Sequence, residues 1–213
     1  TEKELALFGN FMPLEHKRIT AEVCVHHLWF DKSDYAKLGS HIKCNPAIKE
    51  AHHKQALFEA LLDNRLDVIA TDHAPHTLEE KSKPYPNSPS GMTGVQTLVP
   101  IMLDHVNAGR MTLERFVDMT SAGPMRLFGI AGKGRIAAGY DADLTIVDLN
   151  RHETITNAWI QSKCGWTPYD GVSVKGWPIG TIIRGHKVMW EKALVTKARG
   201  EAVRFHETLE PQA

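Results

Sequence analysis

The chain has 213 residues, 42% of them apolar and 23% charged, which is the composition of an ordinary globular protein with its own core. Its 25 basic and 25 acidic residues cancel and no apolar run spans a bilayer, so we expect neither a nucleic-acid partner nor membrane association. Three widely spaced cysteines with no CxxC pattern argue against a disulfide framework and favour a reducing, cytoplasmic setting.

The first third of the chain alternates between helical and strand patterns. Residues 2–8 are in helical register, and residues 19–25 are β-branched and apolar, as in a buried strand. Residues 26–30 are expected to form a loop. Residues 49–62 carry apolar side chains at helical spacing, and residues 63–64 supply a stop signal.

The same alternation continues through the middle of the chain. Residues 66–70 predict a second short apolar strand, and residues 71–76 form the loop at its carboxyl end. Residues 78–90 are polar and rich in Pro, Ser and Lys, which predicts a long loop. Long loops beside strand ends often have a function. Residues 95–108 then predict a helix.

Beyond that helix the pattern changes from mixed to mostly β. Thr112 is a candidate N-cap for a further helix, although Arg115 occupies the position where a capping box has Glu. Residues 125–128 are a short helical piece. Residues 144–148 predict a strand, and residues 181–190 predict a hairpin with Gly185 at or near its turn.

These elements predict an α/β fold. Strand–helix alternation with polar loops at the strand ends is typical of a (β/α)8 barrel, also called a TIM barrel. Two strands cannot close a barrel, so we expect either a longer protein that supplies the remainder before residue 1 or a smaller fold. Residues 1–130 are assigned to the C-terminal part of such a barrel and residues 131–213 to a small β-rich domain, in which Trp166, Trp177 and Trp190 pack.

The most informative local feature is Asp72, which follows an apolar strand. On the active-site face of a parallel barrel, a carboxylate there can bind a metal or accept a proton from water. His76 lies close enough in sequence to contact the same substrate. On spacing alone, Asp72 is equally well a turn-former or a helix N-cap, and His73 and His76 are equally well solvated loop residues. This loop by itself offers too few ligands for a zinc site.

Five segments together resemble dihydroorotases of the amidohydrolase superfamily. Residues 70–81 (ATDHAPHTLEEK) are similar to the C-terminal dihydroorotase signature at every defined position. Residues 22–28 resemble the family's EVTPHHL segment on barrel strand seven, and residues 43–49 its KxNPPLR loop. Residues 89–97 resemble its PFGIVGLET stretch, and residues 134–148 a strand entry shared across the superfamily. Hydantoinases and allantoinases usually lack the Ala-Pro-His element.

This resemblance implies roles for particular residues. Asp72 corresponds to the strand-eight aspartate, which binds zinc, accepts a proton during hydrolysis and later protonates the leaving amide nitrogen. Asn45 and His76 correspond to residues that hold the substrate. Pro89 and Gly91 correspond to a loop whose backbone contacts the pyrimidine ring. The full-length protein is expected to hold one or two zinc ions.

Other positions depart from the family pattern or lack a ligand role in it. His26 and His27 do not correspond to metal ligands and are interpreted as structural residues or as residues that support the ligands. Val25, Ala47 and Ser90 replace Pro, Pro and Phe, so the resemblance alone does not fix the substrate preference. The family's His-x-His pair, bridging ligand and two later histidines are expected before residue 1.

The implied activity is that of a dihydroorotase, which reversibly interconverts N-carbamoyl-L-aspartate and (S)-dihydroorotate in pyrimidine biosynthesis. The alternatives are a hydantoinase- or allantoinase-like cyclic amidohydrolase and a non-catalytic scaffold subunit. A small-molecule substrate is expected, with a homo-oligomer as the expected assembly and a transcarbamoylase as a possible partner. The 213-residue segment alone is predicted to be inactive, because one carboxylate is too few to hold zinc.

Overall fold

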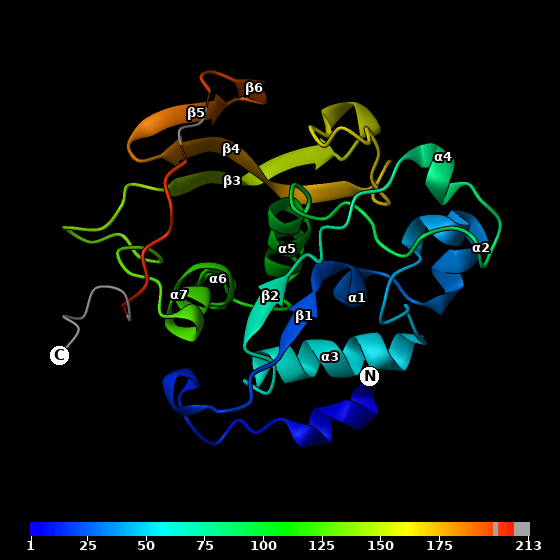
Figure 1. Cartoon of the computed structure of the whole chain (residues 1–213), viewed down its shortest axis with the longest axis horizontal. Coiled ribbons are helices and arrows are strands. Elements are labelled where there is room, and N and C mark those ends of the chain that lie inside the picture. Colours follow the sequence, from blue (N-terminus) through cyan, green and yellow to red (C-terminus); the bar gives the residue numbers. More distant parts are fainter. Residues whose placement is uncertain (198–199, 207–213) are drawn as a thin grey trace.

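The N-terminal part of the chain is built around two short parallel strands, as a computed structural model describing residues 1–197 and 200–206 shows (Figure 1). Strand β1 (Glu22–Cys24) pairs with β2 (Val68–Ala70), and Cys24 lies opposite Ala70. Parallel strands need a long crossover connection, and helix α3 (Ala51–Leu62) lies within it. Both strands and α3 lie where the sequence predicts them, although β1 is shorter than residues 19–25.

The predicted loop at residues 26–30 is instead a helix. Helix α1 (Val25–Trp29) begins directly after β1, with Cys24 as its N-cap residue. His26 and Leu28 are buried, and α1 packs against α3. The expectation was wrong because five residues are too few to display a helical period, and burial of one face outweighs local preference.

Several short helical turns connect these elements. The 3-10 helix η1 (Glu2–Leu7) confirms the helical register at the start of the described chain and packs against α3. Similar turns are η2 (Leu14–His16), η3 (Lys32–Asp34), α2 (Tyr35–Leu38) and η4 (Gly39–Ile42).

The predicted loop at residues 78–90 contains one unpredicted turn of helix, α4 (Leu78–Lys81). A capping box begins it: the Thr77 hydroxyl accepts from the Glu80 backbone N–H at 3.2 Å, and the Glu80 carboxylate accepts from the Thr77 N–H at 2.9 Å. Thr77 and Glu80 have the spacing of a capping-box sequence, so this turn was recognisable without coordinates.

Three further helices follow, separated by a π-helical turn. They are α5 (Leu98–Asn107), α6 (Leu113–Val117) and α7 (Gly123–Phe128), with η5 (Asp118–Ala122) before α7. The Thr112 hydroxyl accepts from the Arg115 N–H at 3.1 Å, which confirms the predicted N-cap. At Gly123, a Cβ atom would meet the Asp118 carbonyl oxygen at 2.8 Å, so only glycine fits where α7 begins.

The C-terminal part forms an antiparallel sheet in the order β3 (Leu144–Thr154), β4 (Ser173–Ile183), β5 (His186–Trp190) and β6 (Ala193–Leu194). The 3-10 helix η6 (Asn157–Trp159) lies in the β3–β4 connection. The predicted hairpin is confirmed: Arg184 and Gly185 both have positive φ, 49° and 78°, as a two-residue type I′ turn requires. Strand β3 extends beyond the predicted residues 144–148.

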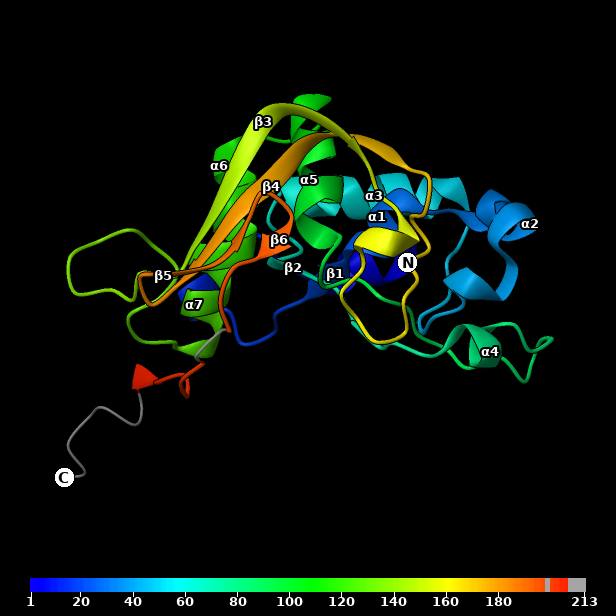
Figure 2. The same ribbon diagram turned by 90° about the horizontal axis from the view of Figure 1, so that it is seen from above.

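Helix α5 connects the two parts of the molecule. It lies between the parallel strand pair and the sheet and packs against β4 (Figures 1 and 2). A Cβ atom on Gly176 of β4 would lie 2.6 Å from the Leu103 Cβ, so this glycine allows the close approach. One buried apolar cluster includes residues from both parts, from Leu5 to Trp177. In residues 1–197 and 200–206, no helix has the length and apolar character needed to cross a bilayer.

The three tryptophans expected in the β-rich part have different roles. Trp177 is buried against Trp159, with ring centroids 4.5 Å apart. Trp190 is half-buried in the sheet beside Gly180. Trp166 packs elsewhere: its Nε1 donates to the His76 carbonyl oxygen at 2.7 Å. Trp166 therefore fixes the loop that carries Asp72 instead of packing within the small sheet.

Candidate functional site

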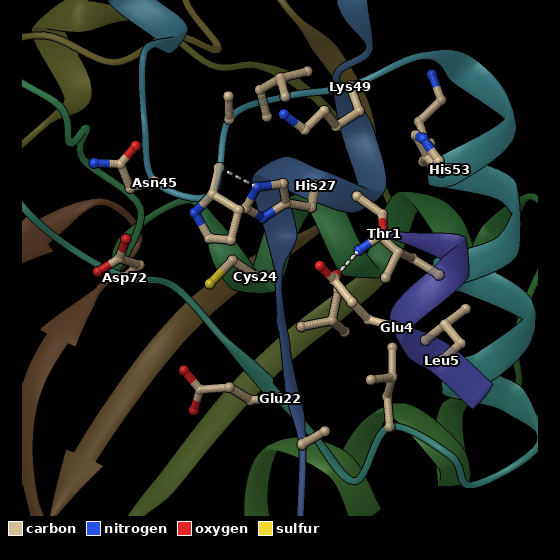
Figure 3. A pocket seen from close by; sticks show the side chains of 18 of the residues that line it. Thr1, Glu4, Leu5, Glu22, Cys24, His27, Asn45, Lys49, His53 and Asp72 are labelled. Atoms are coloured by element: carbon tan, nitrogen blue, oxygen red, sulfur yellow. Dashed lines mark hydrogen bonds and ion pairs between the residues drawn. The ribbon is translucent and has the colours of Figure 1, made fainter. Parts of the chain in front are cut away.

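The carboxyl ends of β1 and β2 meet at one edge of the strand pair, where a cavity of about 530 Å³ opens. Asp72 follows β2, and Cys24 ends β1 opposite Ala70. His27 from α1 and Asn45 from the connection before α3 line the same cavity. In Figure 3 the Asp72 carboxylate and the Asn45 amide lie beside each other, with Cys24 and His27 next to them. Parallel pairing thus places these polar side chains together.

Asp72 offers a free carboxylate to this cavity. It is exposed, and among the described residues none forms a hydrogen bond or ion pair with its side chain. Its backbone has φ 44°, a left-handed conformation that aspartate tolerates better than most residues. The alternative that Asp72 is a helix N-cap is not what the structure has, because α4 begins after Thr77.

The two thiols near the cavity are poor nucleophiles. Burial, with a smaller contribution from the negative charge of Asp72, raises the pKa of the Cys24 thiol to about 12. Burial also raises the pKa of the Cys44 thiol to about 11. Both therefore remain protonated near neutral pH, and nucleophilic catalysis through a thiolate is not favoured.

His26 and His27 are fixed beside Cys24. His27 Nε2 donates to the Pro46 carbonyl oxygen at 2.8 Å, which leaves its Nδ1 as an acceptor. Burial lowers the pKa of His27, and it lowers that of His26, which is 2% exposed, to about 3. Both rings are therefore neutral near pH 7. Ligand atoms of Cys24, His26 and His27 lie within 4.8 Å of one another, so this group is chemically able to hold a metal ion.

The remaining predicted substrate contacts lie in loops that pack against the loop of Asp72, and these loops are here called the wall. The structure brings His76, Pro89 and Gly91 together, but the residues that line the cavity include only Asn45 and Asp72 of the predicted set. His76 Nε2 donates to the Ser90 carbonyl oxygen at 3.1 Å, and its Nδ1 lies 3.6 Å from a Glu80 carboxylate oxygen. The imidazole is thus held by the protein on both sides.

Gly91 fits closely against the loop that carries Asp72. Its φ is 121°, and an added Cβ would lie 2.6 Å from the Ala74 carbonyl oxygen. The Gly91 N–H donates to the Lys43 carbonyl oxygen at 2.9 Å, and its carbonyl accepts from Lys81 at 2.8 Å. Both polar backbone groups of Gly91 are therefore occupied within the protein, which was not foreseen when its backbone was assigned to the pyrimidine ring.

Sequence reasoning missed two features of this site. Cys24 was treated only as part of a strand, although a residue that ends a parallel strand was a recognisable candidate. Lys81 was noted only as the last position of the signature, and it is a fully buried lysine that contacts the loop at residues 89–91. Nothing in the sequence pattern indicates which carbonyl groups a lysine will contact.

This edge of a parallel strand pair, with an unpartnered carboxylate beside an amide and imidazoles, is suited to metal-assisted hydrolysis. A model of the amidohydrolase family matches residues 3–188, and the chain belongs to that family.

Within the family, the chain is similar to dihydroorotases. It is 41% identical over 185 residues to a dihydroorotase of Halobacterium salinarum and 42% identical over 185 residues to one of Pyrococcus furiosus. Each alignment covers 87% of this chain and 43% of the relative, so the chain spans less than half the length of these curated relatives.

Solved structures of an L-hydantoinase and of a dihydropyrimidinase have a similar arrangement of elements. The L-hydantoinase (dihydropyrimidinase) of Arthrobacter aurescens superimposes with a TM-score of 0.86 at 29% identity, over 92% of this chain and 44% of that one. The dihydropyrimidinase of Brevibacillus agri gives 0.77 at 27% identity, over 83% and 40%. The identity to these structures is lower than the identity to the dihydroorotases.

Proposed function

We propose that this chain is part of a dihydroorotase that interconverts N-carbamoyl-L-aspartate and (S)-dihydroorotate in pyrimidine biosynthesis. The observation that supports it most is the free carboxylate of Asp72, beside Asn45, at the carboxyl end of β2. The dihydroorotase signature surrounds that carboxylate, and identity to dihydroorotases reaches 41–42%.

In this proposal Asp72 carries the proton. Water adds to the ring carbonyl carbon, the C–N bond of the cyclic amide breaks, and Asp72 moves one proton from the water to the leaving nitrogen. In the reverse direction, holding both ends of carbamoyl aspartate together favours ring closure. The Asn45 amide orients the substrate. In the same proposal His76, Pro89 and Gly91, on the loops packed against the loop of Asp72, complete the substrate-binding region.

The proposal includes zinc, with one or two ions in the complete site. When bound, zinc would polarise the carbonyl and lower the pKa of the attacking water. The exposed, unpartnered Asp72 carboxylate fits the role of one ligand, but zinc sites use three or four. The other ligands, and the six strands that would join β1 and β2 in a TIM barrel, are therefore proposed to lie on residues of the protein outside this segment.

A hydantoinase-like activity is the second candidate. The TM-score of 0.86 to the L-hydantoinase favours it, while the Ala74-Pro75-His76 element and the higher identity to dihydroorotases argue against it. Both candidates hydrolyse a cyclic amide, so the substrate alone distinguishes them.

The test is a substrate panel. The native protein that carries this segment is loaded with zinc and assayed for hydrolysis of dihydroorotate, hydantoin and dihydrouracil. We expect dihydroorotate to have the highest kcat/KM, with closure of carbamoyl aspartate favoured at lower pH. Higher kcat/KM on hydantoin would select the second candidate, and no turnover of any member would favour a scaffold subunit.

The proposal also includes a cytoplasmic homo-oligomer as the assembly and a transcarbamoylase as its partner. Analytical ultracentrifugation of the native protein, alone and mixed with the transcarbamoylase from the same source, tests both expectations. A protein that sediments as a monomer and does not bind the transcarbamoylase would contradict both expectations and would leave the proposed chemistry unaffected.

A further inference from the structure

Lys81 is a buried cation held by backbone groups. It is 0% exposed, at the end of α4. Its Nζ donates to three carbonyl oxygens, those of Lys43 at 3.2 Å, Pro89 at 3.0 Å and Gly91 at 2.8 Å. An ammonium group has three N–H donors, so its hydrogen-bonding capacity is fully used. Among the described residues, no carboxylate forms an ion pair with it.

The three carbonyl groups belong to the two loops that carry the proposed substrate contacts. Lys43 precedes Asn45 by two residues, and Pro89 and Gly91 flank Ser90. The Ser90 carbonyl in turn accepts from His76 Nε2 at 3.1 Å. One ammonium group thus links the loop of Asn45 to the loop that holds His76.

Neighbouring hydrogen bonds make this junction continuous with the loop of Asp72. The Gly91 N–H donates to the Lys43 carbonyl oxygen at 2.9 Å, and the Ala74 N–H donates to the Met92 carbonyl oxygen at 3.0 Å. The Ser88 hydroxyl donates to the carbonyl of Lys81 itself at 3.1 Å. Release of the ammonium would therefore free both loops together.

We propose that Lys81 is a positioning residue, whose buried ammonium group fixes the loops of Asn45 and of Pro89–Gly91 in the geometry that binds substrate. The substrate-binding part of this inference rests on the proposed function; the ordering of the loops does not.

An apolar side chain of the same length would fill the space equally well. Burying a cation is unfavourable unless its hydrogen bonds are satisfied, and here burial lowers the pKa of Lys81 to about 8. A charge kept in such a place organises the groups around it, because each carbonyl must face the ammonium group. Lys81 cannot itself act on a substrate, since no part of it reaches solvent.

The first experiment measures loop order in the native protein by amide hydrogen exchange. We expect Lys81→Met to accelerate exchange of the Gly91 and Ala74 amides at least about tenfold, while amides of β4 keep their protection. The matched control is Lys17→Met, which removes another buried ammonium group, one that contacts the Asn64 carbonyl and the Asp67 carboxylate and none of the groups that Lys81 binds. Unchanged exchange in Lys81→Met, or equal acceleration in Lys17→Met, would overturn the inference.

If Lys81→Met does not fold, as judged by circular dichroism, Lys81→Gln replaces it. Glutamine keeps two N–H donors without the charge, so we expect a smaller acceleration at the same amides. Wild-type exchange in a folded Lys81→Gln chain would contradict a role for the ammonium group.

The second experiment measures catalysis in the zinc-loaded native protein. We expect Lys81→Met to raise KM for dihydroorotate about tenfold or more and to change kcat less, because lost positioning weakens substrate binding first. In Lys81→Ala, added ethylammonium should restore KM in part, whereas ethanol should not. Unchanged KM, or equal rescue by ethanol, would overturn the substrate-binding role. Absence of activity in the wild type as well would count against the proposed function, and the exchange result would still decide the ordering of the loops.

Discussion

The rim of the cavity and the wall loops packed against it differ in whether their polar groups have partners within the protein. At the rim, Asp72 and Asn45 are exposed, and none of the described residues pairs with the Asp72 carboxylate. In the wall, His76, Gly91 and Lys81 have their polar groups bound within the protein. The difference indicates a division of labour: free groups are left for ligands, and a fully hydrogen-bonded frame holds them in place.

The largest expected effect is at the rim. Asp72→Asn keeps the size of the side chain but removes its basicity and its charge. In the native protein we expect kcat to fall by about 10³-fold, within the range that general acid–base catalysis contributes. Stability should change little, because Asp72 is exposed and none of the described residues forms a hydrogen bond or ion pair with its carboxylate. Steady-state kinetics and a thermal melt test both expectations, and near-normal kcat would remove Asp72 from the mechanism.

Metal binding tests whether the rim is complete in this segment. After dialysis, the 213-residue chain should retain less than about 0.1 equivalent of zinc, since one carboxylate is too few. Elemental analysis of the wild type, Asp72→Asn and Cys24→Ser checks this. If the wild type retained stoichiometric zinc and Cys24→Ser lost it, the metal site would be assigned to the group of Cys24, His26 and His27 instead of to Asp72.

Gly91→Ala probes the wall. The new Cβ would lie 2.6 Å from the Ala74 carbonyl oxygen, in a backbone with φ 121°. We expect a loss of about 2–4 kcal/mol in the free energy of unfolding, because steric overlap adds to backbone strain. Gly109→Ala is the matched control: its φ is 71° and nothing lies within 4 Å, so strain alone should cost about 1 kcal/mol. Urea unfolding measures both free energies. Equal losses in Gly91→Ala and Gly109→Ala would mean that the wall loops move to accommodate the added methyl group.

The sequence predicted the rim better than the wall for a physical reason. Asp72 is a local signal, because a carboxylate after an apolar strand has a defined place at the edge of a parallel pair. Lys81 binds carbonyl groups up to 38 residues away in sequence, and any residue type can supply a carbonyl. The structure of the wall therefore depends on which loops contact each other in the folded chain, and the periodicity of a single sequence does not indicate this.

The fold likewise was predicted well where the signal is local in sequence and poorly where it depends on tertiary contacts. Helix α3, strand β2 and the hairpin at Gly185 have clear periodicity or turn residues, and they lie where predicted. Helix α1 was mistaken for a loop because it has five residues. Trp166 was assigned to the small sheet because an aromatic residue carries no information about its partner, and its Nε1 instead contacts His76.

The smallest effect is expected in the core, outside both the rim and the wall, at His105 of α5. Its side chain is 0% exposed and packs between the rings of Trp29 and Phe58. Neither ring nitrogen has a hydrogen-bond partner among the described residues. Burial, more than the nearby charge of Arg110, lowers the pKa of His105 from 6.5 to about 4. The folded state therefore binds fewer protons than the unfolded state between these pH values, and His105 makes the protein less stable as pH falls from 6.5 towards 4.

His105→Leu removes that titration and keeps an apolar side chain in the cluster. At pH 7.5 we expect little change in stability, because no hydrogen bond with a described residue is lost. At pH 5 the variant should exceed the wild type by about 2 kcal/mol in the free energy of unfolding, as the pKa difference requires. Urea unfolding at both pH values measures this. An equal difference at pH 5 and pH 7.5 would show that His105 does not titrate in this interval. Any loss of stability at low pH would then come from other groups whose pKa is lowered by burial, such as His26.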